Sequence, residues 1–224
     1  WNSVRHARPL SVGFNCALGA KQLRPHIEEL SRIADVYVSA HPNAGLPNAM
    51  AEYDEQPCET AGFIEEWAQN GWLNITGGCC GTTPDHIRAI RDRCADHEVK
   101  PRPEPRDPFV SSMIGAAPLV QDPRPTLVGE RVNSQGSRKA KELLLADDYD
   151  GLVQVAEDQV EGGAHVLDVC VALTERQDED EQMRQVVKRV SLSQPAPIQV
   201  DSTEPDVIRT ALDQIPGRAI VNSI

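Results

Sequence analysis

The stretch Leu73-Asn74-Ile75-Thr76-Gly77-Gly78-Cys79-Cys80-Gly81-Thr82-Thr83-Pro84-Asp85-His86-Ile87 decides the fold. It begins with a short apolar segment that predicts a strand at 73–76 and continues into a glycine-rich turn. Thr83 followed by Pro84 is typical of a helix N-cap and the first helical position. A strand that leads directly into a helix is the repeating unit of parallel α/β folds. The adjacent cysteines therefore fall at the carboxyl end of a predicted strand.

The same alternation extends on both sides of this stretch. Apolar runs predict strands at 12–16, 35–40, 73–76, 127–130, 165–170, 198–202 and 219–223. Helical spacing predicts helices at 23–33, 60–70, 85–93, 150–161, 179–192 and 205–215, with Pro25 tolerable only in a first turn. Strands that alternate with helices favour parallel sheets with crossover helices.

A proline-rich window divides the chain. Seven prolines fall between residues 96 and 125, a density that precludes a regular helix or a central strand and predicts a linker. Three strands precede this window and four follow it, whereas a closed (β/α)8 barrel needs eight. The pattern therefore predicts the C-terminal part of one TIM barrel at 1–95, the Pro-rich linker at 96–125, and the N-terminal half of a second barrel at 126–224.

Composition limits the partners. The 224 residues carry a net charge of −12, and an acidic surface repels phosphate backbones, so no nucleic acid is expected. No apolar run approaches the roughly 20 residues that span a membrane, so no membrane is expected either. Hydrophobic residues make up 40% and aromatic ones 4%, which predicts an aliphatic core. Six cysteines in so core-rich a chain, two of them adjacent, favour a reduced, cytoplasmic protein over a disulfide scaffold.

Three cysteines form a candidate metal site. Cys79 and Cys80 lie among glycines that permit a sharp turn, and Cys16 ends another predicted strand. Zinc prefers four ligands and accepts sulfur donors, so three thiolates with one open position suit a catalytic zinc ion. Two alternatives remain open from the pattern alone. The pair could be buried, inert cysteines in a tight turn, or a metal-free redox thiol pair.

Polar residues also end the later predicted strands. They are Glu130, Asp168, Asp201 and Asn222. Active sites of (β/α) barrels are built from the carboxyl ends of strands, which favours a binding site there. The alternatives are that Asp201 and Asn222 cap nearby helices or turns, and that Glu130 pairs with Arg131.

Several of these segments resemble a known family. Residues 13–19, 41–48 and 77–87 resemble the homocysteine-binding domain of cobalamin-dependent methionine synthases. The Gly-Glu-Arg-Val-Asn segment at 129–133 resembles the pterin-binding domain that follows it, as do the segments at 167–169, 200–202 and 221–223. The order of the two parts and the linker between them also fit, and the resemblance covers nearly the whole chain.

The resemblance implies two (β/α)8 barrels and a methyltransferase. Methyl transfer would run from 5-methyltetrahydrofolate through cobalamin, bound by a module outside this chain, to homocysteine activated on zinc. Carried over, the zinc ligands are Cys16, Cys79 and Cys80, with no catalytic residue beyond this metal site. The pterin ligands are Asp201 and Asn222, with Glu130, Asn133 and Asp168 lining the same pocket.

The resemblance also has departures. The earlier strands of the first barrel and the later strands of the second are not in this sequence, so the segment by itself is expected to be inactive. Cys170 stands where many relatives have Asn, which changes the polar network at that strand end. The alternatives are a non-catalytic zinc-binding fragment, or another corrinoid-, pterin- or thiol-dependent methyltransferase.

Overall fold

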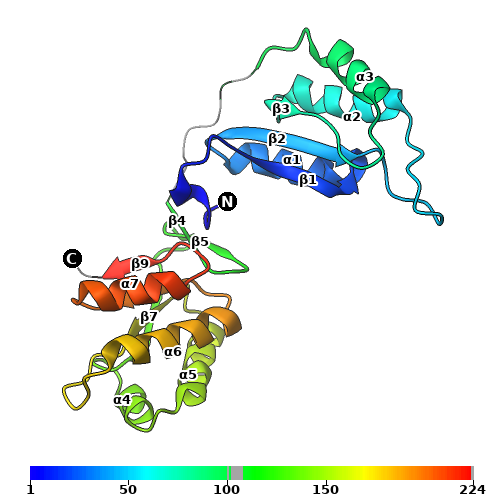
Figure 1. Ribbon diagram of the computed structural model, residues 1–224. Helices are drawn as coiled ribbons and strands as arrows, with labels where there is room; N and C mark the ends of the chain where they lie inside the picture. The colour runs from blue at the N-terminus through cyan, green and yellow to red at the C-terminus, as the bar shows by residue number, and fades with distance from the viewer. Residues whose placement is uncertain (100, 102–107, 223–224) are drawn as a thin grey trace. The chain divides into compact units, whose positions relative to one another are not determined.

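The computed structural model describes residues 1–99, 101 and 108–222, which form two compact α/β units (Figure 1). Within the described residues, the first unit holds Trp1 and the chain from residue 7 to 101, and the second holds residues 2–6 and 108–222. Residues 100 and 102–107 of the predicted linker, and residue 223 of the last predicted strand, lie outside the described residues. No described helix combines the length and the apolar character needed to cross a bilayer.

The first unit is a three-stranded parallel sheet with three α-helices. After the 3-10 helix η1 (Arg5–Ala7), which falls at the sequence boundary between the two units, its elements are β1 (Ser11–Gly19), α1 (Ala20–Ile33), β2 (Tyr37–Asn43), α2 (Pro57–Asn70), β3 (Ile75–Thr76) and α3 (Pro84–Cys94), with sheet order β1-β2-β3. Trp67 of α2 is fully buried and packs in one cluster with Ile27 of α1 and Val38 of β2. The apolar faces of the helices thus cover the sheet.

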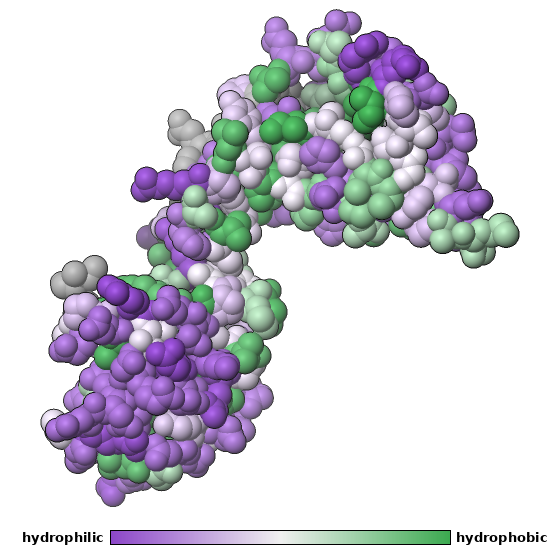
Figure 2. Space-filling view, viewed as in Figure 1, coloured by the Kyte–Doolittle hydropathy of each residue, from purple (hydrophilic) through white to green (hydrophobic). Residues whose placement is uncertain are grey.

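The second unit is a four-stranded parallel sheet preceded by a hairpin. Its elements are β4 (Phe109–Ser111), β5 (Ala116–Pro118), β6 (Val128–Asn133), α4 (Arg138–Leu145), α5 (Tyr149–Glu161), β7 (Val166–Cys170), α6 (Glu179–Ser193), β8 (Ile198–Asp201), α7 (Pro205–Gln214) and β9 (Ile220–Asn222). The parallel order is β6-β7-β8-β9, and β4 pairs with β5 antiparallel. Leu152, Leu167 and Met183 form the centre of its core. Figure 2 shows that the visible outer face around α6 and α7 is largely hydrophilic.

The predicted α/β class with parallel sheets is confirmed, with three parallel strands before the proline-rich window and four after it. Closure into barrels stays a prediction. The third strand is shorter than the predicted 73–76. Asn74 explains this, because its side-chain Oδ1 accepts the Val38 N–H at 3.0 Å, a bond that would otherwise go to strand backbone.

Two helices differ from the pattern. Helix α1 begins at Ala20, so Pro25 lies in its second turn, and the placement in a first turn was wrong. Ala20, completely buried directly after β1, is the first residue of this helix. Helix α4 was missed, although Ser137 is a clear N-cap whose Oγ accepts the Ala140 N–H at 3.2 Å.

The β4–β5 hairpin lies inside the window where proline density argued against regular structure. It forms because Pro118 sits at the end of β5, where a proline removes no central ladder bond. Ser111 and Arg218 then exchange two backbone hydrogen bonds of 3.0 and 2.9 Å. This approach requires Gly217, because a Cβ there would lie 2.0 Å from the Ser111 carbonyl oxygen.

Replacing Gly217 with Ala is therefore expected to detach the hairpin. Backbone must move to relieve the clash, so the amides of Ser111 and Arg218 lose protection from hydrogen exchange. The matched control is Gly115→Ala in the same hairpin, where the nearest atom to a new Cβ is at 3.4 Å. Exchange mass spectrometry of the two variants measures this difference, and equal protection in both would contradict the role given to Gly217.

Candidate functional site

The three predicted metal ligands lie together in the first unit. The Cys16 and Cys80 Sγ atoms are 3.5 Å apart, and those of Cys79 and Cys80 are 4.0 Å apart. All three sulfurs lie within 4.8 Å of one another, and all six cysteines are free thiols. A tetrahedral zinc ion with bonds of about 2.3 Å holds its sulfur ligands roughly 3.8 Å apart. The donor set and its spacing therefore fit zinc with one position left open.

Strand β1 is distorted where it carries Cys16. The residue pairs Asn15 with His41 and Gly19 with Asn43 show that β1 bulges between Asn15 and Gly19. Cys16 and Ala17 both have left-handed backbone conformations, with φ of 64° and 62°. Non-glycine residues adopt this region at a cost, and such strain concentrates at functional sites. The bulge turns the Cys16 thiol toward Cys80.

A tight turn presents the other two thiols. The Thr82 N–H donates to the Cys79 carbonyl at 3.1 Å, and Gly81 between them has φ of 78°, which a type II turn requires of its third residue. The end of β2 and the residue that follows it anchor this turn through two further bonds. The Cys79 N–H donates to the Pro42 carbonyl at 2.8 Å, and the Cys80 carbonyl accepts from the Ala44 N–H at 2.9 Å.

Two residues beside the cysteines were not singled out from the sequence. Asn43 is buried, its Oδ1 accepts the Cys80 N–H at 3.1 Å, and its side chain also bonds to the Cys16 thiol. Tyr53 packs its Cβ against Gly81 and bonds to the Cys80 thiol. Asn43 lies within a segment that carried the family resemblance, but only the fold shows that its amide meets the cysteine turn.

His86, at the start of α3, supports the turn through its two ring nitrogens. Its Nδ1 accepts the Thr83 N–H at 3.2 Å, so its Nε2–H donates to the Glu55 carbonyl at 2.9 Å. His86 is buried in this arrangement. The bond holds the segment that carries Tyr53 against the start of α3.

The three thiols influence one another's protonation. The Ala17 N–H and the two other thiols lower the pKa of Cys16. The hydrogen bond that the Cys79 thiol donates to Cys16, together with burial, raises the pKa of Cys79. Burial and the Cys80 thiol raise the pKa of Tyr53. Cys16 is therefore favoured over Cys79 to become a thiolate, the form that binds metal.

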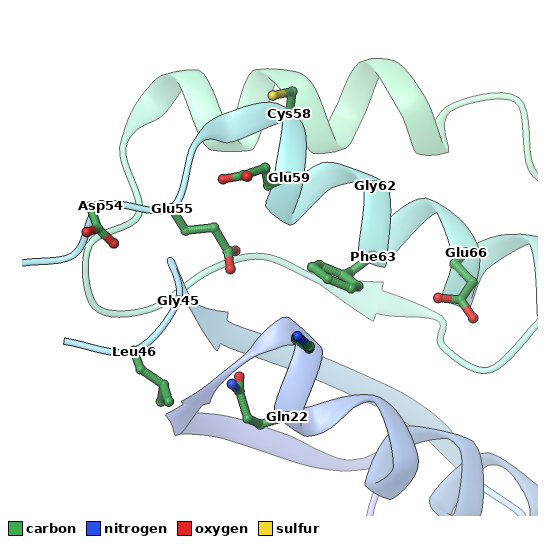
Figure 3. A pocket seen from close by; sticks show the side chains of 11 residues that line it. Gln22, Gly45, Leu46, Asp54, Glu55, Cys58, Glu59, Gly62, Phe63 and Glu66 are labelled. Atoms are coloured by element: carbon green, nitrogen blue, oxygen red, sulfur yellow. The ribbon is translucent and has the colours of Figure 1, made fainter. Parts of the chain in front are cut away.

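A separate cavity of about 760 Å³ lies between α1 and α2 (Figure 3). Three of the carboxylates along it already have partners within the unit. Glu55 accepts from the Thr60 hydroxyl, Glu59 from the Gln56 N–H, and Glu66 from Arg24. None of the three clustered cysteines lines this cavity, so it is distinct from the candidate metal site.

The second unit gathers its predicted polar residues at the carboxyl ends of its strands. Asn133 ends β6, and its Nδ2 donates to Asp168 Oδ2 at 2.6 Å and to Asp201 Oδ2 at 2.9 Å. Asn222 Nδ2 makes a longer bond of 3.4 Å to Asp201 Oδ1. The Asp201 carboxylate on β8 thus bonds to side-chain amides from β6 and β9, an arrangement different from a helix cap.

Glu130 is the one predicted residue that stands apart from this cluster. It is exposed on a bulge of β6, where the pairing shifts between Gly129 and Val132. Within the described chain no ion pair joins Glu130 to Arg131. The Arg131 N–H donates instead to Gln159 of α5 at 2.6 Å.

The Asp168 and Asp201 carboxyl groups of this cluster repel each other when both are charged. Burial and the negative charge of Asp168 raise the pKa of Asp201, while the Asn133 amide opposes the rise. Cys170 is buried with its pKa raised by burial, and it accepts a hydrogen bond from the Ser134 hydroxyl. It is therefore a neutral packing residue beside the carboxylates.

Comparison with known proteins defines the class of each unit. Residues 1–94 match the model of the homocysteine S-methyltransferase family, and residues 129–224 match that of the pterin-binding enzymes. The chain thus combines a homocysteine S-methyltransferase portion with a pterin-binding portion.

The chain belongs to the methionine synthase family, as a segment that spans those two portions. It is 41% identical over 226 residues to the methionine synthase of Mycobacterium leprae (strain TN) and 40% identical over 220 residues to that of Mycobacterium tuberculosis (strain ATCC 25618 / H37Rv). Each alignment covers 95% of this chain and 18% of the relative's length.

Two solved structures match this chain at low sequence identity and low TM-score. The carboxyl transferase domain from Rhizobium etli pyruvate carboxylase, with 3-bromopyruvate or with 3-hydroxypyruvate, matches at 12% and 13% identity with TM-scores of 0.28 and 0.30. These matches cover 94% and 98% of this chain and 32% and 34% of those structures.

Replacing Gly81 with Ala is expected to weaken metal retention by the cysteine cluster. A left-handed alanine costs about 1–2 kcal/mol, and its Cβ would lie 2.3 Å from Tyr53 Cβ, so the turn that presents Cys79 and Cys80 must deform. The control is Gly62→Ala on α2, where a new Cβ meets only Arg93 Nη1 at 3.4 Å. The measurement is zinc loss to a competing chelator. Equal rates in both variants would contradict the turn's role.

Replacing Asp201 with Asn is expected to remove a pH-dependent destabilisation of the second unit. Because the folded-state pKa of Asp201 is raised, the folded protein holds this proton more tightly than the unfolded chain. Wild-type stability therefore falls as pH rises from about 3.9, the ordinary aspartate pKa, through the raised value, and stays reduced above it. The variant lacks this fall.

The matched control is Asp213→Asn, at an exposed position on α7. Hydrogen exchange of the second unit, followed from about pH 4 to about pH 8, compares the pH dependence of stability in the three proteins. Parallel curves for wild type and Asp201→Asn would show that Asp201 carries no such penalty.

Proposed function

We propose that the protein carrying this chain transfers a methyl group from 5-methyltetrahydrofolate to homocysteine, with cobalamin as carrier, giving methionine and tetrahydrofolate. The observation that carries the proposal is the convergence of Cys16, Cys79 and Cys80 within 4.8 Å in a unit that matches the homocysteine S-methyltransferases. In the net reaction the N5–methyl bond breaks and a sulfur–methyl bond forms. The proton lost by the homocysteine thiol balances the one gained by N5.

The first unit activates the thiol. A zinc ion held by Cys16, Cys79 and Cys80 supplies Lewis acidity that keeps a substrate thiol deprotonated yet nucleophilic at neutral pH, where a free thiol with a pKa near ~8.5 is mostly protonated. The protein's own contribution is to hold the three sulfurs at metal-binding distances. Asn43 contributes by fixing the Cys80 backbone, and the bulge at Cys16 contributes by aiming its thiol.

The second unit binds the methyl donor. Asp201 and Asn222 suit the amino and ring N–H donors of a pterin, since a carboxylate accepts and an amide both donates and accepts. Asp201 Oδ1 has only a long bond of 3.4 Å from Asn222, which supports its availability to a ligand. Asn133 and Asp168 are proposed to support Asp201 in this pocket, and Glu130, exposed on the β6 bulge, is proposed to line it. A tertiary amine leaves poorly unless protonated, so groups that orient the pterin and stabilise its protonated form favour transfer.

The wider organisation is part of the same proposal. Residues 1–95 and 126–224 are sectors of two (β/α)8 barrels joined by the Pro-rich segment 96–125, and a module outside this chain binds cobalamin. The polar clusters at the carboxyl ends of the parallel strands support this, because barrel active sites lie there. Free thiols throughout the chain fit a cytoplasmic location.

Two variants of the native protein test this proposal by affecting its two sites separately. Cys80→Ala is expected to abolish methionine formation while leaving 5-methyltetrahydrofolate binding unchanged. Asp201→Ala is expected to weaken 5-methyltetrahydrofolate binding at least tenfold while leaving the zinc content unchanged. The control is Cys58→Ala, at an exposed cysteine on α2. Full methionine formation by Cys80→Ala would overturn the zinc-thiol proposal, and unchanged binding by Asp201→Ala would overturn the pterin proposal.

A further inference from the structure

Asn133, a predicted pterin ligand, has no hydrogen-bonding capacity left for a ligand. Its two Nδ2 hydrogens go to Asp168 and Asp201. Its Oδ1 accepts the N–H groups of Gln135 at 2.8 Å and Gly136 at 3.1 Å. An asparagine side chain has two donors and two acceptor lone pairs, so all four are used. Asn133 is also buried, and its place is therefore behind the ligand-contacting groups.

The Asp168 side chain is buried more deeply than Asn133. It is 2% exposed, and each carboxylate oxygen accepts a short amide bond, Oδ2 from Asn133 at 2.6 Å and Oδ1 from Gln199 Nε2 at 2.6 Å. Among the described residues neither Asp168 nor Asp201 pairs with a Lys or Arg side chain. Neutral amides alone therefore stabilise two neighbouring carboxylates, and a buried carboxylate without donors is costly.

We propose that Gln199 of β8 is a positioning residue for the pterin site, acting through Asp168 and Asn133 on Asp201. The hydrogen bonds run Gln199 to Asp168, Asp168 to Asn133 and Asn133 to Asp201, across β8, β7, β6 and back to β8. Gln199 fixes the Asp168 carboxylate, Asp168 fixes the Asn133 amide, and that amide fixes the Asp201 oxygen that faces away from Asn222. The inference rests on the proposed pterin-binding function.

The orientation of Gln199 follows from strand alternation. Gln199 and Asp201 are two residues apart on β8, so their side chains share one face of the sheet. Asp168 of β7 pairs directly with Gln199 in the parallel register, and Asn222 of β9 pairs with Asp201. Ile198 and Val200, which alternate with them, face the hydrophobic core instead. An amide at position 199 thus serves the polar face, where an aliphatic residue would leave Asp168 Oδ1 unbonded.

The test exchanges donor and acceptor between positions 199 and 168 in the native protein. Gln199→Glu sets two carboxylates against each other and is expected to weaken 5-methyltetrahydrofolate binding tenfold or more, by about the cost of an unsatisfied buried group. The double variant Gln199→Glu/Asp168→Asn restores the bond, because the new amide at 168 can donate to position 199 and accept from Asn133. Its affinity is expected to return to within about threefold of wild type at unchanged net charge.

Two further variants separate positioning from a merely structural role. Gln199→Met removes the donor without adding charge and is expected to weaken binding by about tenfold while the protein stays folded. Gln154→Glu makes the same substitution beside Asp158 on the exposed face of α5 and is expected to bind as wild type does. Affinities are measured by titration calorimetry at a temperature where circular dichroism shows every variant folded. If Gln199→Glu does not fold, Gln199→Met and the double variant carry the comparison.

The outcomes distinguish this inference from the proposed function. If wild type binds no 5-methyltetrahydrofolate, the pterin proposal fails, and the inference fails with it. If wild type binds and Gln199→Met or Gln199→Glu binds equally well, the positioning role alone is overturned. A double variant no tighter than Gln199→Glu would likewise overturn it, since the restored bond should restore the orientation of Asp201.

Discussion

Parallel strand pairing is the constraint on which both clusters depend. Because neighbouring strands run in the same direction, residues that end β1 and the loops after β2 and β3 meet at one edge of the first sheet. The same geometry brings Asn133, Asp168, Asp201 and Asn222 together in the second. Strand pairing thus brings residues that are far apart in sequence close together in space.

The two sites meet the cost of bringing reactive groups close together in different ways. In the first unit the cost lies in the backbone, where Cys16 and Ala17 adopt left-handed conformations and a glycine turn presents the second and third thiols. In the second unit the cost is electrostatic, because two carboxylates share a buried environment and only neutral amides stabilise them. Each arrangement leaves groups available to a ligand, three clustered thiols in the first unit and a weakly bonded Asp201 oxygen in the second.

Much of this architecture could be predicted because strand and helix signals are local. Thr83-Pro84 marked the start of α3, and the apolar runs gave the right number of parallel strands. The roles of Gln199 and Asn43 could not be predicted in this way. A glutamine inside an apolar strand forms no recognisable motif. Its role depends on the strand register, which places it opposite Asp168. The saturation of Asn133 likewise depends on two backbone amides in a turn that only the fold defines.

The proposed methyl transfer depends on one zinc ion held by Cys16, Cys79 and Cys80 together. The zinc content of the reduced, zinc-replete native protein, combined with X-ray absorption at the zinc edge, tests this directly. We expect about one zinc per chain with three protein sulfur ligands at about 2.3 Å, lost in Cys79→Ala and retained in Cys58→Ser. A folded protein without zinc, or zinc that survives Cys79→Ala with its sulfur coordination intact, would contradict it.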